Sequence, residues 1–376
     1  MDVHARADNT SRFKGQDVYL YPSARFGWKL SNEPFLQNST AISHLQVNAG
    51  YGISGNDGGL SIGQLYQYAL QYQYSNNGSV YALDSLLSFN PDEKKRLDTL
   101  PGLNRNIMNL ERLDPEQTEQ ISLGLEVGFF DNKLSLTAMY HKKSTTGLLL
   151  PMLNATDTVI RFGNIGEINR NCIDISLATR NIETNSIKWH TQLHASFVQS
   201  EIAPLKQAVN TTVLEGHTVN SFEENGEVIG NPNPDLIYSI NNTLRIYNFE
   251  LNLFLQGVFG VDAINMNKYY LSDPDTYTNK LKGLSPASDV TSLKPFVEDG
   301  SYLKFKNIML AYYLPPMLAN KLKIDSGKLF FSLENIYTFT AYSGYDPENI
   351  YNGFSGIDLG MYPNARSIVF GIDLTF

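Results

Sequence analysis

The sequence predicts an all-β fold, an antiparallel β-barrel that crosses a membrane with its strands. Three observations predict it. Apolar and polar residues alternate along most of the 376 residues, the alternating segments are longer than the strands of soluble sheets, and short and long connections alternate between them. Together these features are typical of a transmembrane barrel with short periplasmic turns and long extracellular loops.

The alternation is the primary signal, because successive side chains of a strand point to opposite faces. Segments 121–129 and 187–198 both show it. It is clearest at the C-terminal end, where one face consists of Ile368, Phe370, Ile372, Leu374 and Phe376. A sheet with one apolar and one polar face follows from this pattern.

Counting such segments gives about eleven strands. Residues 2–7 are interpreted as the tail of one more strand. Strands of roughly 10–13 residues exceed the usual five or six and match the length that a tilted strand needs to cross a bilayer. The expected strands lie near 18–30, 42–53, 118–130, 133–143, 171–181, 187–199, 236–247, 250–261, 300–314, 327–341 and 366–376.

The connections between these segments alternate in length, which sandwiches and propellers have no reason to do. We expect the short ones on the periplasmic side and the long ones outside the cell. The short ones lie near 31–41, 131–132, 182–186, 248–249 and 315–326. The long ones lie near 54–117, 144–170, 200–235, 262–299 and 342–365.

Composition excludes several other classes of protein. The formal net charge is −9, so the basic footprint of a nucleic-acid binder is missing. One cysteine cannot form a disulfide framework or a cysteine-based zinc site. No stretch approaches eighteen consecutive apolar residues, which excludes a transmembrane helix, and residues 1–8 lack the apolar segment of a signal peptide.

Aromatic residues are expected at both membrane interfaces of such a barrel. Several lie near the predicted strand ends. The candidate members of these girdles are Trp28, Tyr140, Tyr312, Tyr313 and Tyr337.

Specific stretches of the chain resemble the SusC/RagA family of TonB-dependent outer-membrane transporters. The strongest is Val297-Glu-Asp-Gly-Ser-Tyr-Leu-Lys-Phe-Lys-Asn-Ile308. Further stretches follow the family's order over nearly the whole chain: Tyr21-Pro-Ser-Ala-Arg-Phe-Gly-Trp28, Gly50-Tyr-Gly-Ile-Ser-Gly-Asn56, Glu119-Gln-Ile-Ser-Leu-Gly-Leu-Glu126, Gly230-Asn-Pro-Asn-Pro-Asp235, Ser332-Leu-Glu-Asn-Ile336, Tyr342-Ser-Gly-Tyr-Asp-Pro-Glu348 and Gly360-Met-Tyr-Pro363.

This resemblance implies the C-terminal half of a barrel of about 22 strands with a plugged lumen, with the plug domain and the signal peptide absent from residues 1–376. It implies nutrient import in a Gram-negative bacterium, with uptake of an oligosaccharide or peptide. The implied partners are a SusD-like surface lipoprotein, the TonB complex acting through the missing N-terminal part, the barrel-assembly machinery and outer-membrane lipid. The chain would supply barrel wall and outer loops, without enzymatic chemistry and without a cofactor.

Two segments are candidate functional sites. The C-terminal strand, with Ile368, Phe370, Ile372, Leu374 and Phe376, resembles the signal that barrel-assembly machinery recognises; the alternative is an ordinary lipid-facing strand. In the longest connection, aromatic residues alternate with Gln67, Ala69, Gln71 and Gln73. They predict an aromatic platform for a ligand, or else a strand packed on neighbouring loops. The platform consists of Tyr66, Tyr68, Tyr72 and Tyr74.

No catalytic or metal-binding motif emerges from the sequence. His190 and His194 share one strand face but are about 13 Å apart, too far for one metal ion, and are interpreted as lumen-facing polar residues. Asp273-Pro-Asp275 and Asp346-Pro-Glu348 lack the spacing of a calcium loop and are interpreted as solvated turns. Motifs of nucleophilic hydrolases, zinc proteases and phosphate loops are missing.

The alternatives are a smaller self-contained barrel and a soluble β-rich carbohydrate-binding module. A soluble module should bury Leu123, Leu193 and Phe370, whereas a barrel should expose them to lipid. A complete small barrel should pair its first and last strands. A half barrel should leave them as unpaired edges, and such a chain alone would not be stable in water.

Overall fold

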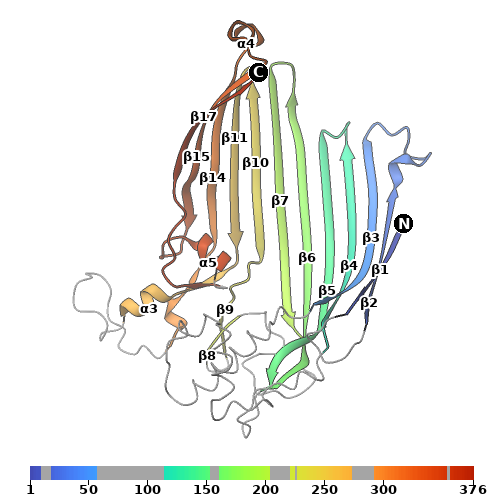
Figure 1. The fold of residues 1–376 in the computed structure, drawn as a ribbon, viewed down its shortest axis with the longest axis vertical. Coiled ribbons are helices and arrows are strands. Elements are labelled where there is room, and N and C mark those ends of the chain that lie inside the picture. The colour runs from blue at the N-terminus through green and yellow to red at the C-terminus, as the bar shows by residue number, and fades with distance from the viewer. Residues whose placement is uncertain are drawn as a thin grey trace, which may run out of the picture.

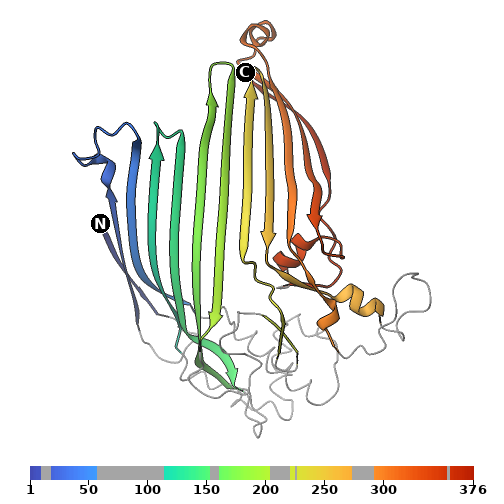
Figure 2. The same cartoon turned by 180° about the vertical axis from the view of Figure 1, so that it is seen from behind.

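A computed structural model describes residues 1–9, 18–56, 114–152, 161–203, 221–224, 227–272, 292–353 and 356–376. Twelve antiparallel strands form one sheet, each hydrogen-bonded to its neighbours along the chain order. Both views show them as a single curved layer (Figures 1 and 2). The strands are β1 (Asp2–Asp8), β2 (Tyr19–Lys29), β3 (Ile42–Asn56), β4 (Glu116–Phe129), β5 (Leu134–Met152), β6 (Arg161–Glu183), β7 (Ile187–Ile202), β10 (Leu236–Ile246), β11 (Phe249–Phe259), β14 (Tyr302–Tyr313), β15 (Ser326–Thr340) and β17 (Ser367–Thr375).

These strands confirm the all-β prediction, and each predicted segment contains a strand. The additional strand expected at 2–7 is β1, which pairs with β2. One connection was predicted wrongly, because β5 and β6 run far into the expected loop 144–170. There Ser144 donates a hydrogen bond to Glu167 across the hairpin (3.2 Å). The alternation breaks in this extension, because Leu148, Leu149 and Leu150 are consecutive and the register shifts around Leu148, so the period-two pattern did not predict it.

The two faces of the sheet differ as the alternation predicts. Register places Leu125 opposite both Val47 and Ala138, and the apolar face continues from strand to strand in this way. On that face Leu123 is 52% exposed and Phe370 is 70% exposed; Leu193 is half-buried. A soluble module would have covered these side chains, so the exposed apolar face favours a surface made for lipid.

The opposite face carries hydrogen-bonded polar side chains. Asn48 donates to Glu126 (2.9 Å), and Ser196 donates to Asp174 (2.6 Å). His194 lies 2.8 Å from the hydroxyl of Ser176, with Nδ1 as the contacting atom. A polar face of this kind is what the interior of a transmembrane barrel requires.

The connections sort by length between the two ends of the sheet. Figure 1 shows the turns after β2, β4, β6, β10 and β14 at one end and the long connections at the other, as the sequence predicts. The turn after β14 carries the helix α4 (Pro316–Leu322). Among the described residues, no helix is long and apolar enough to cross a membrane.

Within the described residues the sheet is open. β1 and β17 are its two edges and do not pair with each other. This agrees with the expectation for a partial barrel and differs from that for a closed small barrel. Each edge strand presents a row of backbone groups without a strand neighbour.

Four of the five candidate girdle residues lie on the apolar face. Trp28, 44% exposed, pairs across the sheet with Val47, and its ring nitrogen donates to Glu33. The prediction for Tyr313 was wrong. Its hydroxyl donates to Glu250 (3.3 Å), and the Arg245 guanidinium lies 4.4 Å from its ring centre on the polar face. Neighbouring residues of a strand point to opposite faces, so Tyr312 and Tyr313 cannot both face lipid.

Candidate functional site: the loop module on β14

The apolar pattern of β14 changes phase in mid-strand. Leu303 and Phe305 occupy odd positions, whereas Ile308, Leu310 and Tyr312 occupy even positions. One extra residue is therefore needed to keep both sets on one face. The register shifts between Phe305 and Asn307, as in a β-bulge. This arrangement leaves Lys304 on the polar face, in register with Gln256 and Thr338.

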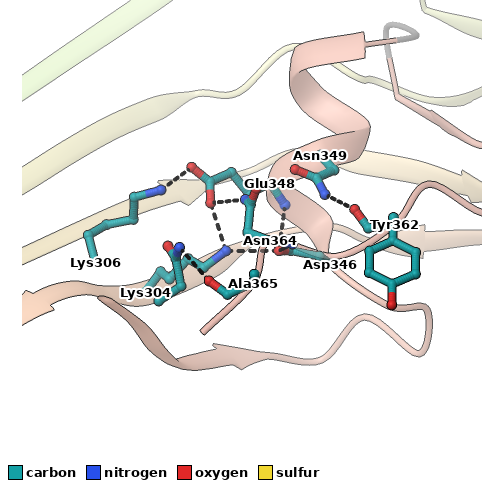
Figure 3. Close-up of polar contacts among 9 residues, drawn as sticks. Lys304, Lys306, Asp346, Glu348, Asn349, Tyr362, Asn364 and Ala365 are labelled. Atoms are coloured by element: carbon teal, nitrogen blue, oxygen red, sulfur yellow. Dashed lines mark hydrogen bonds and ion pairs between the residues drawn. The ribbon is translucent and has the colours of Figure 1, made fainter. Parts of the chain in front are cut away.

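Lys304 lies at the centre of a buried cluster of charges (Figure 3). Its Nζ contacts Asp346 Oδ2 at 2.9 Å and Glu348 Oε2 at 2.7 Å. The Nζ of Lys306 contacts Glu348 Oε1 at 2.7 Å. Lys304 is 2% exposed, Asp346 8% and Glu348 7%. Two lysines and two carboxylates balance in charge, which burial in a protein interior demands.

The carboxylates are positioned by the short helix α5 (Pro347–Gly353) and the chain after it. Asp346 accepts the backbone N–H of Glu348 (3.1 Å) at the start of the helix. Asn364 donates its side-chain amide to Glu348 (2.9 Å) and its backbone N–H to Asp346 (3.2 Å). Farther along, Asn349 donates to the carbonyl of Tyr362 (2.6 Å). Residues 346–349 are thus joined to residues 362–364 and tied to β14.

A small mixed sheet completes the loop module, by which we mean residues 261–272, 294–299, 342–353 and 356–364. Its strands are β12 (Asp262–Asn265), β13 (Val297–Asp299) and β16 (Ile357–Asp358). The helix α3 (Met266–Ser272) and the turn η5 (Lys294–Phe296) adjoin it. A separate hairpin of β8 (Phe222–Glu224) and β9 (Glu227–Gly230) lies at the same end of the molecule.

Three further contacts hold this module together. The hydroxyl of Tyr342 donates to the buried carboxylate of Asp358 at 2.7 Å, and burial raises the pKa of this phenol. Lys268 contacts Glu298 at 2.9 Å, and Ser343 donates to the same carboxylate at 2.8 Å. Burial raises the pKa of Glu298, but these hydrogen bonds outweigh it, so the pKa lies below its usual range.

The charge on Glu348 is likewise stabilised. Burial alone would raise its pKa; the hydrogen bonds and charges of Lys304 and Lys306 outweigh that effect, so the net pKa is lowered. The paired charges of this cluster therefore act as an anchor, which fixes the connection after β15 to the polar face of β14.

Acid is expected to loosen this anchor. A carboxylate with a lowered folded pKa stabilises the folded state above the unfolded pKa of about 4.3, and this contribution is lost as pH falls through the folded pKa. Hydrogen exchange of residues 346–353, corrected for the intrinsic rate, should be constant above about pH 5 and should rise below about pH 4. The matched control is Glu348→Gln, which should weaken this acid dependence. An identical pH profile in that variant would assign the effect elsewhere.

The sites predicted from the sequence differ in whether the structure describes them and in whether the prediction was correct. Tyr66, Tyr68, Tyr72 and Tyr74 lie outside the described residues, as do residues 273–275. The C-terminal strand is the edge strand β17, with Phe376 84% exposed. The prediction of a solvated turn at Asp346-Pro-Glu348 was wrong, because both carboxylates are buried. Sequence reasoning also missed Lys304 and Lys306, although two lysines in an otherwise apolar stretch could have signalled buried partners.

Comparisons with known proteins agree with this fold. No family model matches the chain. It is 26% identical to TonB-dependent receptor P3 of Formosa agariphila, over 99% of this chain and 43% of that protein. It is 24% identical to TonB-dependent receptor SusC of Bacteroides thetaiotaomicron, over 99% of this chain and 41% of that protein.

The RagAB peptide importer in its open-open state is similar in structure. The TM-score is 0.73 at 19% identity, and the match covers 100% of this chain and 45% of the other. The chain thus spans less than half the length of the proteins it matches. Over 99% of its length the chain is similar in sequence to TonB-dependent receptors, SusC among them, and its fold is similar to that of the RagAB importer.

Proposed function

We propose that this chain forms part of a TonB-dependent importer that takes nutrients across the outer membrane. The observation that carries the proposal is a single-layer sheet with one exposed apolar face and one polar face, in a chain similar to SusC along its length. Apolar side chains then contact lipid, and the polar face lines the lumen. The named relatives are receptors and an importer, and we assign transport without covalent chemistry.

The chain contributes the C-terminal barrel wall and the outer loops. A groove of about 330 Å³ on the polar face, across β6, β7, β10 and β11, offers hydrogen-bonding groups to a hydrophilic solute. Its polar lining includes Asp174, Ser176, His194, Ser196 and Gln256. The loop module, anchored by Lys304, narrows the outer end of the lumen beside β14. A plug and a TonB-contacting segment elsewhere in the protein open the path.

The proposed substrate is an oligosaccharide or a peptide. A SusD-like surface lipoprotein closes over the long connections, where Tyr66, Tyr68, Tyr72 and Tyr74 form an aromatic platform for the ligand. Removing Tyr66, Tyr68 and Tyr72 together should lower ligand affinity, and unchanged affinity would contradict the platform.

Barrel-assembly machinery recognises the apolar residues of β17. Membrane insertion that is unchanged by Phe376→Ala would dispose of that signal.

Energised uptake tests the proposal. In a bacterium expressing the full-length protein, labelled oligosaccharides and peptides are offered to wild-type cells, to cells lacking this gene and to cells lacking TonB. We expect at least one substrate class to accumulate only when both genes are present, and a protonophore to abolish that uptake. Uptake that persists without TonB, or that is the same without this gene, would contradict the proposal.

A further inference from the structure

The helix α4 stands beyond the strand ends, at the tip of the turn between β14 and β15 (Figures 1 and 2). It begins with Pro316 and ends at Leu322. The next residue, Lys323, has a left-handed backbone (φ 56°), and its N–H donates to the carbonyls of Ala319 and Asn320. Ala319 is 2% exposed and Ile324 is 7% exposed. These buried residues hold the helix in a fixed position on the turn.

The turn continues the apolar face of the sheet. Leu314 follows Tyr312 by two residues and therefore lies on the same face. Its side chain occupies the space that a Cβ at Gly327 would need, and Gly327 pairs with Leu374 of β17. At this end of the sheet Leu374 is 47% exposed and Phe376 is 84% exposed.

The outer side of α4 is apolar and bears two lysines. Met317 is 75% exposed, Leu318 41% and Leu322 57%. Lys321 and Lys323 are exposed beside them. In the part of the chain that the structure describes, neither lysine has an ion-pair partner. Exposed apolar residues with adjacent lysines are typical of segments that lie in a membrane interface.

We propose that α4 is a lipid anchor whose occupant is the phospholipid leaflet on the short-turn side of the barrel. Met317, Leu318 and Leu322 enter the acyl region, and Lys321 and Lys323 bind headgroup phosphates. Continuity with the apolar face and charge complementarity select lipid as the occupant. The inference rests on the proposed membrane function and adds a defined lipid contact at the short-turn end of the barrel wall.

Collision spectroscopy tests the inference. The full-length protein, free of other cysteines and with Cys172→Ser, is placed in nanodiscs of phosphatidylethanolamine and phosphatidylglycerol. Nitroxides are attached at Met317→Cys or Leu318→Cys, with Asn320→Cys as the matched position on another side of α4. Leu251→Cys on the apolar face reports insertion of the barrel itself. Collisions with oxygen report lipid, and collisions with a water-soluble nickel complex report water.

We expect positions 317, 318 and 251 to favour oxygen several-fold over position 320, which should favour the nickel complex. Nickel access at 317 and 318 equal to that at 320, with 251 still in lipid, would overturn the anchor and leave the proposed function standing. Protection of 317 and 318 from both reagents would also overturn it, because a protein would then cover α4. Nickel access at 251 would overturn both the proposed function and the anchor.

Discussion

Replacing Lys304 with methionine is expected to release the loop module from β14. The substitution removes the amine that contacts both Asp346 and Glu348 while both carboxylates remain in a buried site. Breaking a buried ion pair in this way costs about 3–5 kcal/mol. Since 1.4 kcal/mol corresponds to tenfold, opening of residues 346–353 should become about 100-fold more frequent or greater. Hydrogen exchange of that segment, measured in the full-length protein at neutral pH, gives this ratio.

Lys306→Met is the matched control from the same strand. Lys306 is 23% exposed, and its ion pair among the described residues is with Glu348, which keeps its bond to Lys304. We expect an effect nearer to that of a surface pair, about 0–1 kcal/mol. The two variants therefore differ in burial and in the number of carboxylates that lose a partner. Equal exchange rates in both would show that the buried charges are not the anchor.

A charge placed on the apolar face should destabilise the barrel in lipid. Leu123→Arg puts a guanidinium among exposed apolar side chains near the middle of β4. Arginine at the bilayer midplane of a transmembrane barrel costs about 2–4 kcal/mol. The free energy of unfolding of the full-length protein in liposomes, from denaturant titration, should fall by this amount.

Gln120→Arg provides the comparison on the opposite face of β4. Gln120 hydrogen-bonds Ser122 (2.9 Å) on the polar face, where a guanidinium remains hydrated. Its free energy of unfolding should stay within about 1 kcal/mol of the parent protein. A loss of stability as large as that of Leu123→Arg would contradict the assignment of the apolar face to lipid and of the polar face to water.

The strands were predictable from the sequence because alternation repeats along each of them. Ile121, Leu123 and Leu125 fix the phase of β4, and the partner strands repeat it in register. The pattern fails where the alternation breaks, which is why the outer parts of β5 and β6, with their register shifts around Leu148, were predicted as a loop. It also cannot place two adjacent aromatic residues on one face, as the prediction for Tyr312 and Tyr313 required.

The charged anchor could not be predicted from local pattern. Lys304 and Glu348 are 44 residues apart, and their meeting depends on a bulge in β14 and on the fold of the connection after β15. Asp346-Pro-Glu348 taken alone has the composition of a surface turn. Only the three-dimensional path of residues 342–364 decides that these carboxylates are buried.

In the part of the chain that the structure describes, β1 and β17 each have one margin without a strand partner, which imposes a thermodynamic condition on entry into the bilayer. Hydrocarbon offers no hydrogen bonds, so each free N–H or C=O carried into it costs several kcal/mol. A row of such groups along either margin therefore adds a large cost to the transfer of the open sheet into lipid. Ring closure with additional strands and transfer into the bilayer are therefore expected to be coupled.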